Sequence, residues 1–162
     1  MVTGYSKIQI ALHWATALFV LFNLIFSDAM TAAWRAFRKT GEASADAGAW
    51  AHIIVGVLVL LFALWRMSLR LTRGVPDAPA GESALVKLAG DLGHWALYAL
   101  MLALPVTGLL AWFGGIATLA ELHAEILKSL LWVTIVLHVA AAIWHHFILK
   151  DGLLDRMRKA QD

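Results

Sequence analysis

The sequence predicts an all-α integral membrane protein, a four-helix bundle with both termini in the cytoplasm. Hydrophobic residues make up 61% of the 162 residues and charged residues only 15%. Because a soluble domain carries about 25% charged residues, this chain has too little charge to cover a soluble globule. Four long apolar stretches, and an unequal distribution of basic residues between them, complete the evidence for this fold class.

The four spans are expected at residues 8–27, 49–69, 92–116 and 124–149, within a single transmembrane domain over residues 1–162. Each is close to the ~20 residues that an α-helix needs to cross the hydrocarbon core. Helices are expected because a segment in lipid must satisfy its own backbone hydrogen bonds. Residues 73–83, which contain two prolines, are expected to form a loop. Pro105 and Gly108 are expected to kink the third span.

The distribution of lysine and arginine predicts the orientation, because cytoplasmic segments carry the excess of basic residues. One side has nine basic residues in or beside its segments: Lys7, Arg66, Arg70, Arg73, Lys87, Lys150, Arg156, Arg158 and Lys159. The opposite side has three: Arg35, Arg38 and Lys39. Both termini are therefore expected on the cytoplasmic side.

Seven histidines and no cysteine define the candidate chemistry. Without cysteine the chain cannot form disulfides, thiolate-held iron–sulfur clusters, cysteine-ligated zinc sites or the covalent attachment of c-type haem. Ionisable residues inside a membrane span are costly and usually functional. Since neutral imidazole is a ligand of haem iron, the histidines are candidate ligands for non-covalent haem. A single histidine near a span end would more often be an ordinary polar residue of the bundle.

The depth of the histidines divides them into two groups. His52 and His123 alone fall in the outer half, so an outer haem with two histidine ligands has one possible pair. The inner half contains the others: His13, His94, His138, His145 and His146.

The inner pair is less determined. His138 is about 22 Å beyond His123 along a helix, whereas His145 would be about 33 Å beyond it, more than the hydrocarbon thickness. This favours His138 as the ligand from the fourth span. His13, however, lies only about 8 Å inside the first span, nearer the depth of His145. Depth alone therefore leaves both candidates open.

Small residues near a histidine leave room for a porphyrin, because positions three and four residues further on share its face. Three histidines have such neighbours: Thr16 and Ala17 follow His13, Gly56 follows His52, and Ala141 and Ala142 follow His138. His94 is followed by Leu97 and Tyr98, which makes it a poorer candidate. Ordinary helix packing in membranes also uses small residues.

Other polar residues have two interpretations each. His145 shares nearly the same face as His138, so it could serve a quinone ring or a proton relay near the inner headgroups, or be an interfacial histidine. Arg66, Arg70 and Arg73 share one helix face, where they could pair with haem propionates or extend to the headgroups.

Four segments of the chain, in order, resemble the bacterial cytochrome b561 family of dihaem inner-membrane proteins. They are YSKIQIALHW (5–14), HIIVG (52–56), LGHWALY with ALPVTG (92–98 and 103–108), and LHVAAA with HHF (137–142 and 145–147). The resemblance covers nearly the whole chain, and each segment falls in its proper span.

The resemblance implies two non-covalent b haems, each held by two histidines. Carried over by motif, His13 and His138 would ligate the inner haem, and His52 and His123 the outer haem. His145 would lie at a candidate quinone site. The resemblance also implies a multi-pass protein of the bacterial inner membrane that exchanges electrons with ubiquinone.

Two departures from the family accompany this resemblance. The outer turn over 113–121 is short and has no basic residue. The spacing from His123 to His138 is one residue longer than is usual in the family. One extra residue rotates a helix face by about 100°, so a local bulge is expected between the two histidines.

The expected function is that of an oxidoreductase which takes electrons from superoxide and reduces ubiquinone, as in the family's superoxide oxidase. The expected partners are lipid, quinone and superoxide, with no nucleic acid. A haem-bearing anchor for a partner dehydrogenase or hydrogenase is the alternative, and a transporter without haem is a third hypothesis.

Charged residues on the outer side allow two interpretations. The outer basic residues Arg35, Arg38 and Lys39 could attract an anion, or form an ordinary loop balanced by nearby carboxylates. Glu121 and Glu125 could orient His123 or accept a proton, or simply lie at the interface.

Overall fold

The computed structural model describes residues 4–79 and 81–160, and within them all regular structure is helical. The elements follow in this order: α1 Lys7–Ile25, α2 Asp28–Thr40, α3 Ala47–Arg73, α4 Ala84–Gly114, α5 Ala117–Glu121, η1 Leu122–Leu127, α6 Lys128–Trp144, η2 His145–Leu149 and η3 Leu154–Met157. Elements α5 to η2 join end to end into one long helix.

Four helices are long and apolar enough to cross a membrane, which confirms the predicted four spans: Lys7–Ile25, Ala47–Arg73, Ala84–Gly114 and Ala117–Leu149. The third and fourth helices begin earlier than expected, because hydropathy indicates only the lipid-embedded residues, whereas each helix starts several residues before them. The predicted turn over 113–121 is therefore wrong in extent. It consists of Gly115 and Ile116, with Gly115 in the left-handed conformation at φ +65°.

Local sequence signals determine where three of the helices begin. Ser6 and Gln9 form a capping box at the start of α1, with each side chain accepting a hydrogen bond from the other's backbone N–H. The Asp46 carboxylate accepts from the Ala49 N–H at 2.8 Å and caps α3. Ser83 caps α4 in the same way through the Val86 N–H.

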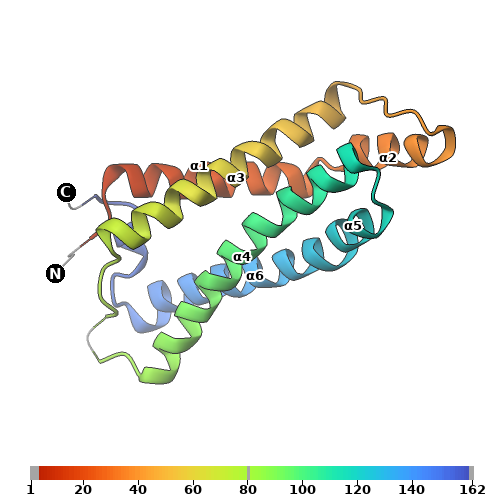
Figure 1. Cartoon of the computed structure of the whole chain (residues 1–162). Coiled ribbons are helices and arrows are strands. Elements are labelled where there is room, and N and C mark those ends of the chain that lie inside the picture. Colours follow the sequence, from red (N-terminus) through yellow and green to blue (C-terminus); the bar gives the residue numbers. More distant parts are fainter. Residues whose placement is uncertain (1–3, 80, 161–162) are drawn as a thin grey trace.

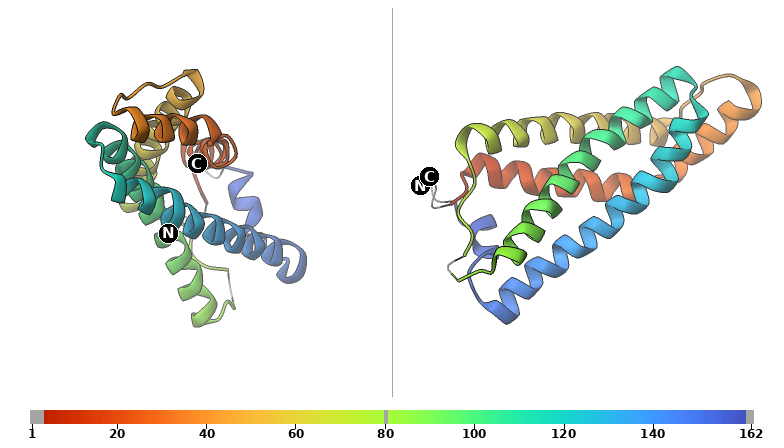
Figure 2. Two further views of the ribbon diagram at one scale, coloured as in Figure 1. Left: turned by 90° about the vertical axis from the view of Figure 1, so that its right-hand side faces the viewer. Right: turned by 60° about the horizontal axis from the view of Figure 1, so that its bottom comes forward.

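The spanning helices pack as α1 on α3, α3 on α4, and α4 on α6. The two ends of the chain lie at the same end of the bundle, and α2 lies at the opposite end (Figure 1). A second orientation shows α4 and the long helix over Ala117–Leu149 inclined beside the α1–α3 pair (Figure 2). This arrangement agrees with the predicted topology, in which both termini share the side with more basic residues.

The outward faces of the spanning helices are apolar. Leu18, Leu71 and Leu137 are each at least 65% exposed, and they come from α1, α3 and α6. A soluble protein would bury such side chains, whereas acyl chains cover them in a bilayer. Helix association therefore depends on close packing and polar contacts more than on hydrophobic burial.

The outer segment after the first span is an amphipathic helix, α2, to which the sequence prediction assigned no secondary structure; an ordinary loop was one of its two interpretations. Its Ala33 is buried with Ala49 and Trp112, and Trp34 and Phe37 pack against this cluster. The basic side chains of α2 occupy its exposed face. Thirteen residues are too few to span a membrane, so the length of apolar stretches gives no signal for this helix.

A glycine allows α2 to approach α3. A Cβ atom added at Gly48 would lie only 2.6 Å from the Cβ of Ala29. The space at this crossing is therefore already filled, and any larger residue must push the two helices apart.

We expect Gly48→Ala to lower the free energy of unfolding by about 1–3 kcal/mol, because the added methyl group overlaps Ala29. The matched control is Gly90→Ala in α4, where no atom lies within 4 Å of the added Cβ. That change should be neutral or stabilising by up to about 1 kcal/mol, through helix propensity alone. Thermal unfolding of the purified protein in detergent measures both, and equal effects would contradict the packing argument.

Candidate functional site

The structure arranges four of the histidines as two facing pairs. His52 of α3 and His123 of η1 have ring centroids 6.3 Å apart in the outer half of the bundle. His13 of α1 and His138 of α6 have ring centroids 6.3 Å apart in the inner half. Each pair therefore joins two helices across the bundle interior.

The spacing of both pairs matches what two axial ligands of one haem iron require. An imidazole nitrogen binds a transition metal at about 2.0 Å, and it lies about 1 Å from the centre of its ring. Two imidazoles on opposite sides of one iron therefore have centroids about 6 Å apart. Both pairs meet this distance without any rearrangement of the helices.

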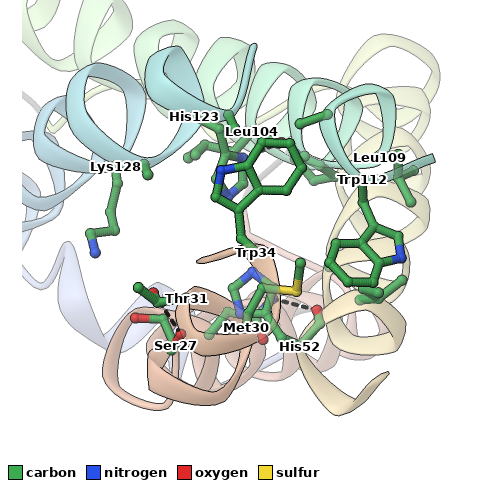
Figure 3. Close-up of a pocket in the computed structure, with 18 of the residues that line it drawn as sticks. Ser27, Met30, Thr31, Trp34, His52, Leu104, Leu109, Trp112, His123 and Lys128 are labelled. Atoms are coloured by element: carbon green, nitrogen blue, oxygen red, sulfur yellow. Dashed lines mark hydrogen bonds between the residues drawn. The ribbon is translucent and has the colours of Figure 1, made fainter. Parts of the chain in front are cut away.

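The outer pair lines a cavity of about 380 Å³. His52 and His123 lie on opposite sides of it, and Trp34 of α2 and Trp112 of α4 are among the residues around it (Figure 3). The remaining walls are mainly apolar, as is typical of a site for a large flat cofactor. Helix α2, absent from the sequence prediction, thus covers part of this cavity.

A backbone carbonyl orients His123. Its Nδ1 lies 2.8 Å from the carbonyl oxygen of Leu104. Because a carbonyl only accepts, Nδ1 must donate, and the proton of the neutral ring is on that nitrogen. Nε2 then keeps its lone pair for a metal, which is the usual arrangement of a histidine ligand and its supporting group.

Gly108 provides the space for this ring against α4. A Cβ atom at that position would lie 3.0 Å from Cε1 and 3.1 Å from Nδ1 of His123. Helix α4 is continuous through Pro105 and Gly108, so the glycine serves close approach here.

The expected bulge between His123 and His138 is present. Residues Leu122–Leu127 form a π-helix, in which the N–H of Lys128 bonds to the carbonyl of His123. A π-turn takes up one residue more than an α-turn, which compensates for the longer spacing. It lets His123 and His138 face the same interior despite that spacing.

His52 and Asn23 leave polar atoms unpaired at the outer cavity. The Asn23 side-chain amide donates to the His52 carbonyl at 3.1 Å. Within the described residues, the buried side-chain atoms without a partner are Asn23 Oδ1 and His52 Nδ1. Unpaired polar atoms lining one cavity are consistent with a site for a bound group. Asn23 was not among the predicted site residues, although an amide inside an apolar span was the available signal.

The inner pair fits in distance but differs in its hydrogen bonding. Arg66 Nη2 lies 3.0 Å from His13 Nδ1. A guanidinium only donates, so Nδ1 accepts and the proton of His13 is on Nε2. Iron binding through Nε2 thus requires Arg66 to release this nitrogen. Arg66 also lies over the ring of Tyr98, 5.7 Å from its centroid.

The other inner histidines have separate positions. His94 packs edge-on against His138 with centroids 5.4 Å apart, so it lies beside the inner histidine pair. His145 instead contacts Asp151 and Glu82 at the end of the fourth helix. Of the two candidates that depth left open, the structure therefore places His138 opposite His13. His146 packs edge-on against Phe147.

Charged residues are few around the outer cavity: Arg35, Glu121, Glu125 and Lys128 line it. Arg38 and Lys39 lie on the exposed face of α2. The outer basic residues thus belong to a helix rather than a loop.

Residues 4–160 match the family model of prokaryotic cytochrome b561. The chain belongs to this family. It is 39% identical to a cytochrome b562 of Cereibacter sphaeroides over 156 residues, which cover 96% of each chain. It is 28% identical to a probable superoxide oxidase of Yersinia pestis over 176 residues, 94% of each chain. It is 27% identical to a cytochrome b561 homolog of Escherichia coli K12, covering 94% of this chain and 90% of the relative.

Family membership establishes the broad chemistry. This member of the cytochrome b561 family is a multi-pass bacterial membrane protein with b-type haem, and its chemistry is electron transfer.

The π-turn in this cytochrome allows a direct test of histidine alignment. Deleting Ile126, a lipid-facing residue of the π-turn, should turn Leu122–Leu127 into an α-turn and leave the haem content unchanged. Deleting Val133, equally exposed but in α6, should rotate His138 by about 100° relative to His123 and reduce haem content. The pyridine haemochrome assay measures both, and similar losses in the two variants would contradict this role of the π-turn.

Proposed function

We propose that this cytochrome carries electrons across much of the bacterial inner membrane, from superoxide on the outer side to ubiquinone. The observation that carries the proposal is the pair of histidine layers, each with centroids 6.3 Å apart. In this account His52 and His123 ligate an outer haem b, and His13 and His138 ligate an inner haem b.

The two layers would place both irons within the thickness of one membrane. His123 and His138 belong to the same continuous helix, about 22 Å apart along its axis if every residue rose as in an α-helix. The bound haems would supply reversible one-electron chemistry.

The protein's own residues hold and enclose these sites. The Leu104 carbonyl keeps the Nδ1 proton of His123, so that Nε2 faces the interior as a ligand. Because His52 and His123 would both hold the group, a substrate would exchange electrons at the edge of the site, without binding the metal. Helix α2 covers the outer cavity, and Arg35 lines it. A cation in the cavity wall would attract an anionic substrate such as superoxide.

The overall reaction balances for electrons and protons. Two superoxide anions become two molecules of dioxygen and release two electrons. One ubiquinone takes up the two electrons and two protons and becomes ubiquinol. Similarity to a probable superoxide oxidase of Yersinia pestis supports this choice of donor. The inner end near His145 is the proposed quinone site, since electrons would arrive there from the inner layer.

We expect His52→Ala and His123→Ala each to remove one haem and leave the other, because each takes one of two axial ligands from the outer site. His146→Ala is the control, since this histidine contacts Phe147 and neither proposed pair. Pyridine haemochrome quantification should give half the wild-type haem in the first two variants and the full amount in the third. Retention of the wild-type haem content by both outer variants would refute the outer pair.

The purified protein, alone in detergent, should reduce a soluble ubiquinone analogue rapidly when superoxide is generated in the solution. Arg35→Gln should slow this reaction about two- to fivefold at low salt, and the difference should shrink at high salt as charges are screened. Stopped-flow spectroscopy follows both. If quinone reduction requires an added dehydrogenase or hydrogenase, the protein is an anchor subunit and the superoxide proposal fails.

A further inference from the structure

A buried histidine at the inner end has a carboxylate beside each ring nitrogen. His145 is 7% exposed. Its Nδ1 lies 2.5 Å from Asp151 Oδ2, and its Nε2 lies 3.8 Å from Glu82 Oε1. The side chains of Asp151 and Glu82 are 17% and 13% exposed, so both carboxylates still reach the surface. We call these three residues the inner acid–base cluster; neither proposed haem pair uses them.

The backbone is bent to bring Asp151 onto His145. The spanning helix ends at Leu149, and Lys150 has φ +52°, the only positive φ of a non-glycine residue in the described chain. Gly152 follows with φ +73°. The left-handed conformation is unfavourable for lysine, so the surrounding contacts must maintain it. The left-handed conformation at Lys150 reverses the direction of the chain immediately after the helix, so that Asp151 packs back against that helix.

Glu82 comes from a different segment, the loop between α3 and α4. Arg156 of η3 donates to the Asp77 carbonyl in that loop at 2.5 Å. Trp14 of α1 donates to the Met157 carbonyl at 2.9 Å. These contacts join the C-terminal segment, the loop and α1 into a cap over the inner end. His145 lies beneath the cap, whereas its two carboxylates lie at the cap's edge.

Hydrogen bonds favour the ionised form of the Asp151 carboxyl group. Partial burial opposes its ionisation, but the hydrogen bonds from the His145 ring and the Leu153 N–H outweigh this effect and lower the pKa of Asp151. The carboxylates that contact the imidazole are Asp151 from its own turn and Glu82 from the loop. Arg156 and Asp77 belong to the same cap. An imidazole between two carboxylates can receive a proton at one nitrogen and release one from the other.

The position of the cluster matches the place where protons are needed. His145 is seven residues beyond His138, about two helical turns, and on nearly the same face. Electrons that reach the inner layer therefore arrive close to this imidazole. Reducing a quinone to a quinol consumes two electrons and two protons, and the hydrocarbon core supplies no protons.

We propose that His145, Asp151 and Glu82 form the proton-transfer route from cytoplasmic water to quinone reduced at the inner end. The proposal rests on the proposed quinone-reducing function. For each electron, one proton passes from the His145 ring to a quinone oxygen, where an O–H bond forms. A carboxylate of the cluster then takes a proton from hydronium in the water at the cap's edge and passes it to the ring nitrogen beside it, so that its O–H bond breaks as the ring N–H bond forms again.

The test compares two acceptors with the haem-loaded protein in lipid nanodiscs. Dithionite-reduced protein is mixed either with a ubiquinone analogue, which needs protons, or with ferricyanide, which does not. His145→Gln and Asp151→Asn should slow haem reoxidation by quinone about 10- to 100-fold and leave the ferricyanide rate and haem content unchanged. Asp77→Asn is the matched control: it removes an exposed carboxylate of the same cap and should change neither rate.

Chemical rescue separates proton transfer from a structural role. Imidazole added to the buffer should restore much of the quinone rate of His145→Gln, because a small weak acid can replace the missing ring. The proposal is overturned if these variants reduce quinone at the wild-type rate. It is equally overturned if they lose haem, or lose both rates together, since the cluster then only holds the cap. If the wild-type protein itself reduces no quinone, both the proposed function and the proton route fail. If only the variants behave unlike the prediction, the proton route fails and the proposed function stands.

Discussion

The facing of imidazole rings across the bundle is the constraint on which the rest of this structure depends. Two rings must lie about 6 Å apart to share an iron, and in this protein they come from different helices. Several local features serve that requirement at His123. Gly108 lets the ring lie against α4, the Leu104 carbonyl selects its tautomer, and the π-turn at Leu122–Leu127 turns it toward the interior. Together these three features orient the His123 ring so that its Nε2 is available as a ligand.

Much of the architecture could be predicted from sequence because lipid imposes simple rules on composition. The four spans and the shared end of both termini follow from hydropathy and charge, whereas the need for a bulge after His123 follows from the resemblance to the family together with helix geometry. Helix α2 could not be predicted from span length, because its helical character comes from packing Trp34 and Phe37 against Trp112. Depth left the inner pair open, since uncertain helix ends shift each estimate by several ångströms. The resemblance to the family assigned His138 to this pair, and the packed helices bring His138, rather than His145, opposite His13.

The two ends of the bundle are built differently, and the difference corresponds to the proposed direction of electron flow. The outer end is covered by an amphipathic helix whose apolar residues close a cavity and whose Arg35 lines it. The inner end is covered by a polar cap that encloses a histidine between two carboxylates. The first end suits a small anion that gives up an electron without protons. The second suits a carrier in the membrane that must gain protons together with electrons.

The central claim is that the two histidine layers hold two b haems, and cofactor stoichiometry tests it most directly. The protein should be purified under haem-sufficient expression and its haem measured against chain concentration, with a reduced-minus-oxidised spectrum of the same sample. The account predicts two non-covalent b haems per chain, both extractable with acidified acetone and both low-spin in the oxidised state. A stoichiometry of one haem per chain, or a high-spin haem with an open axial position, would contradict it.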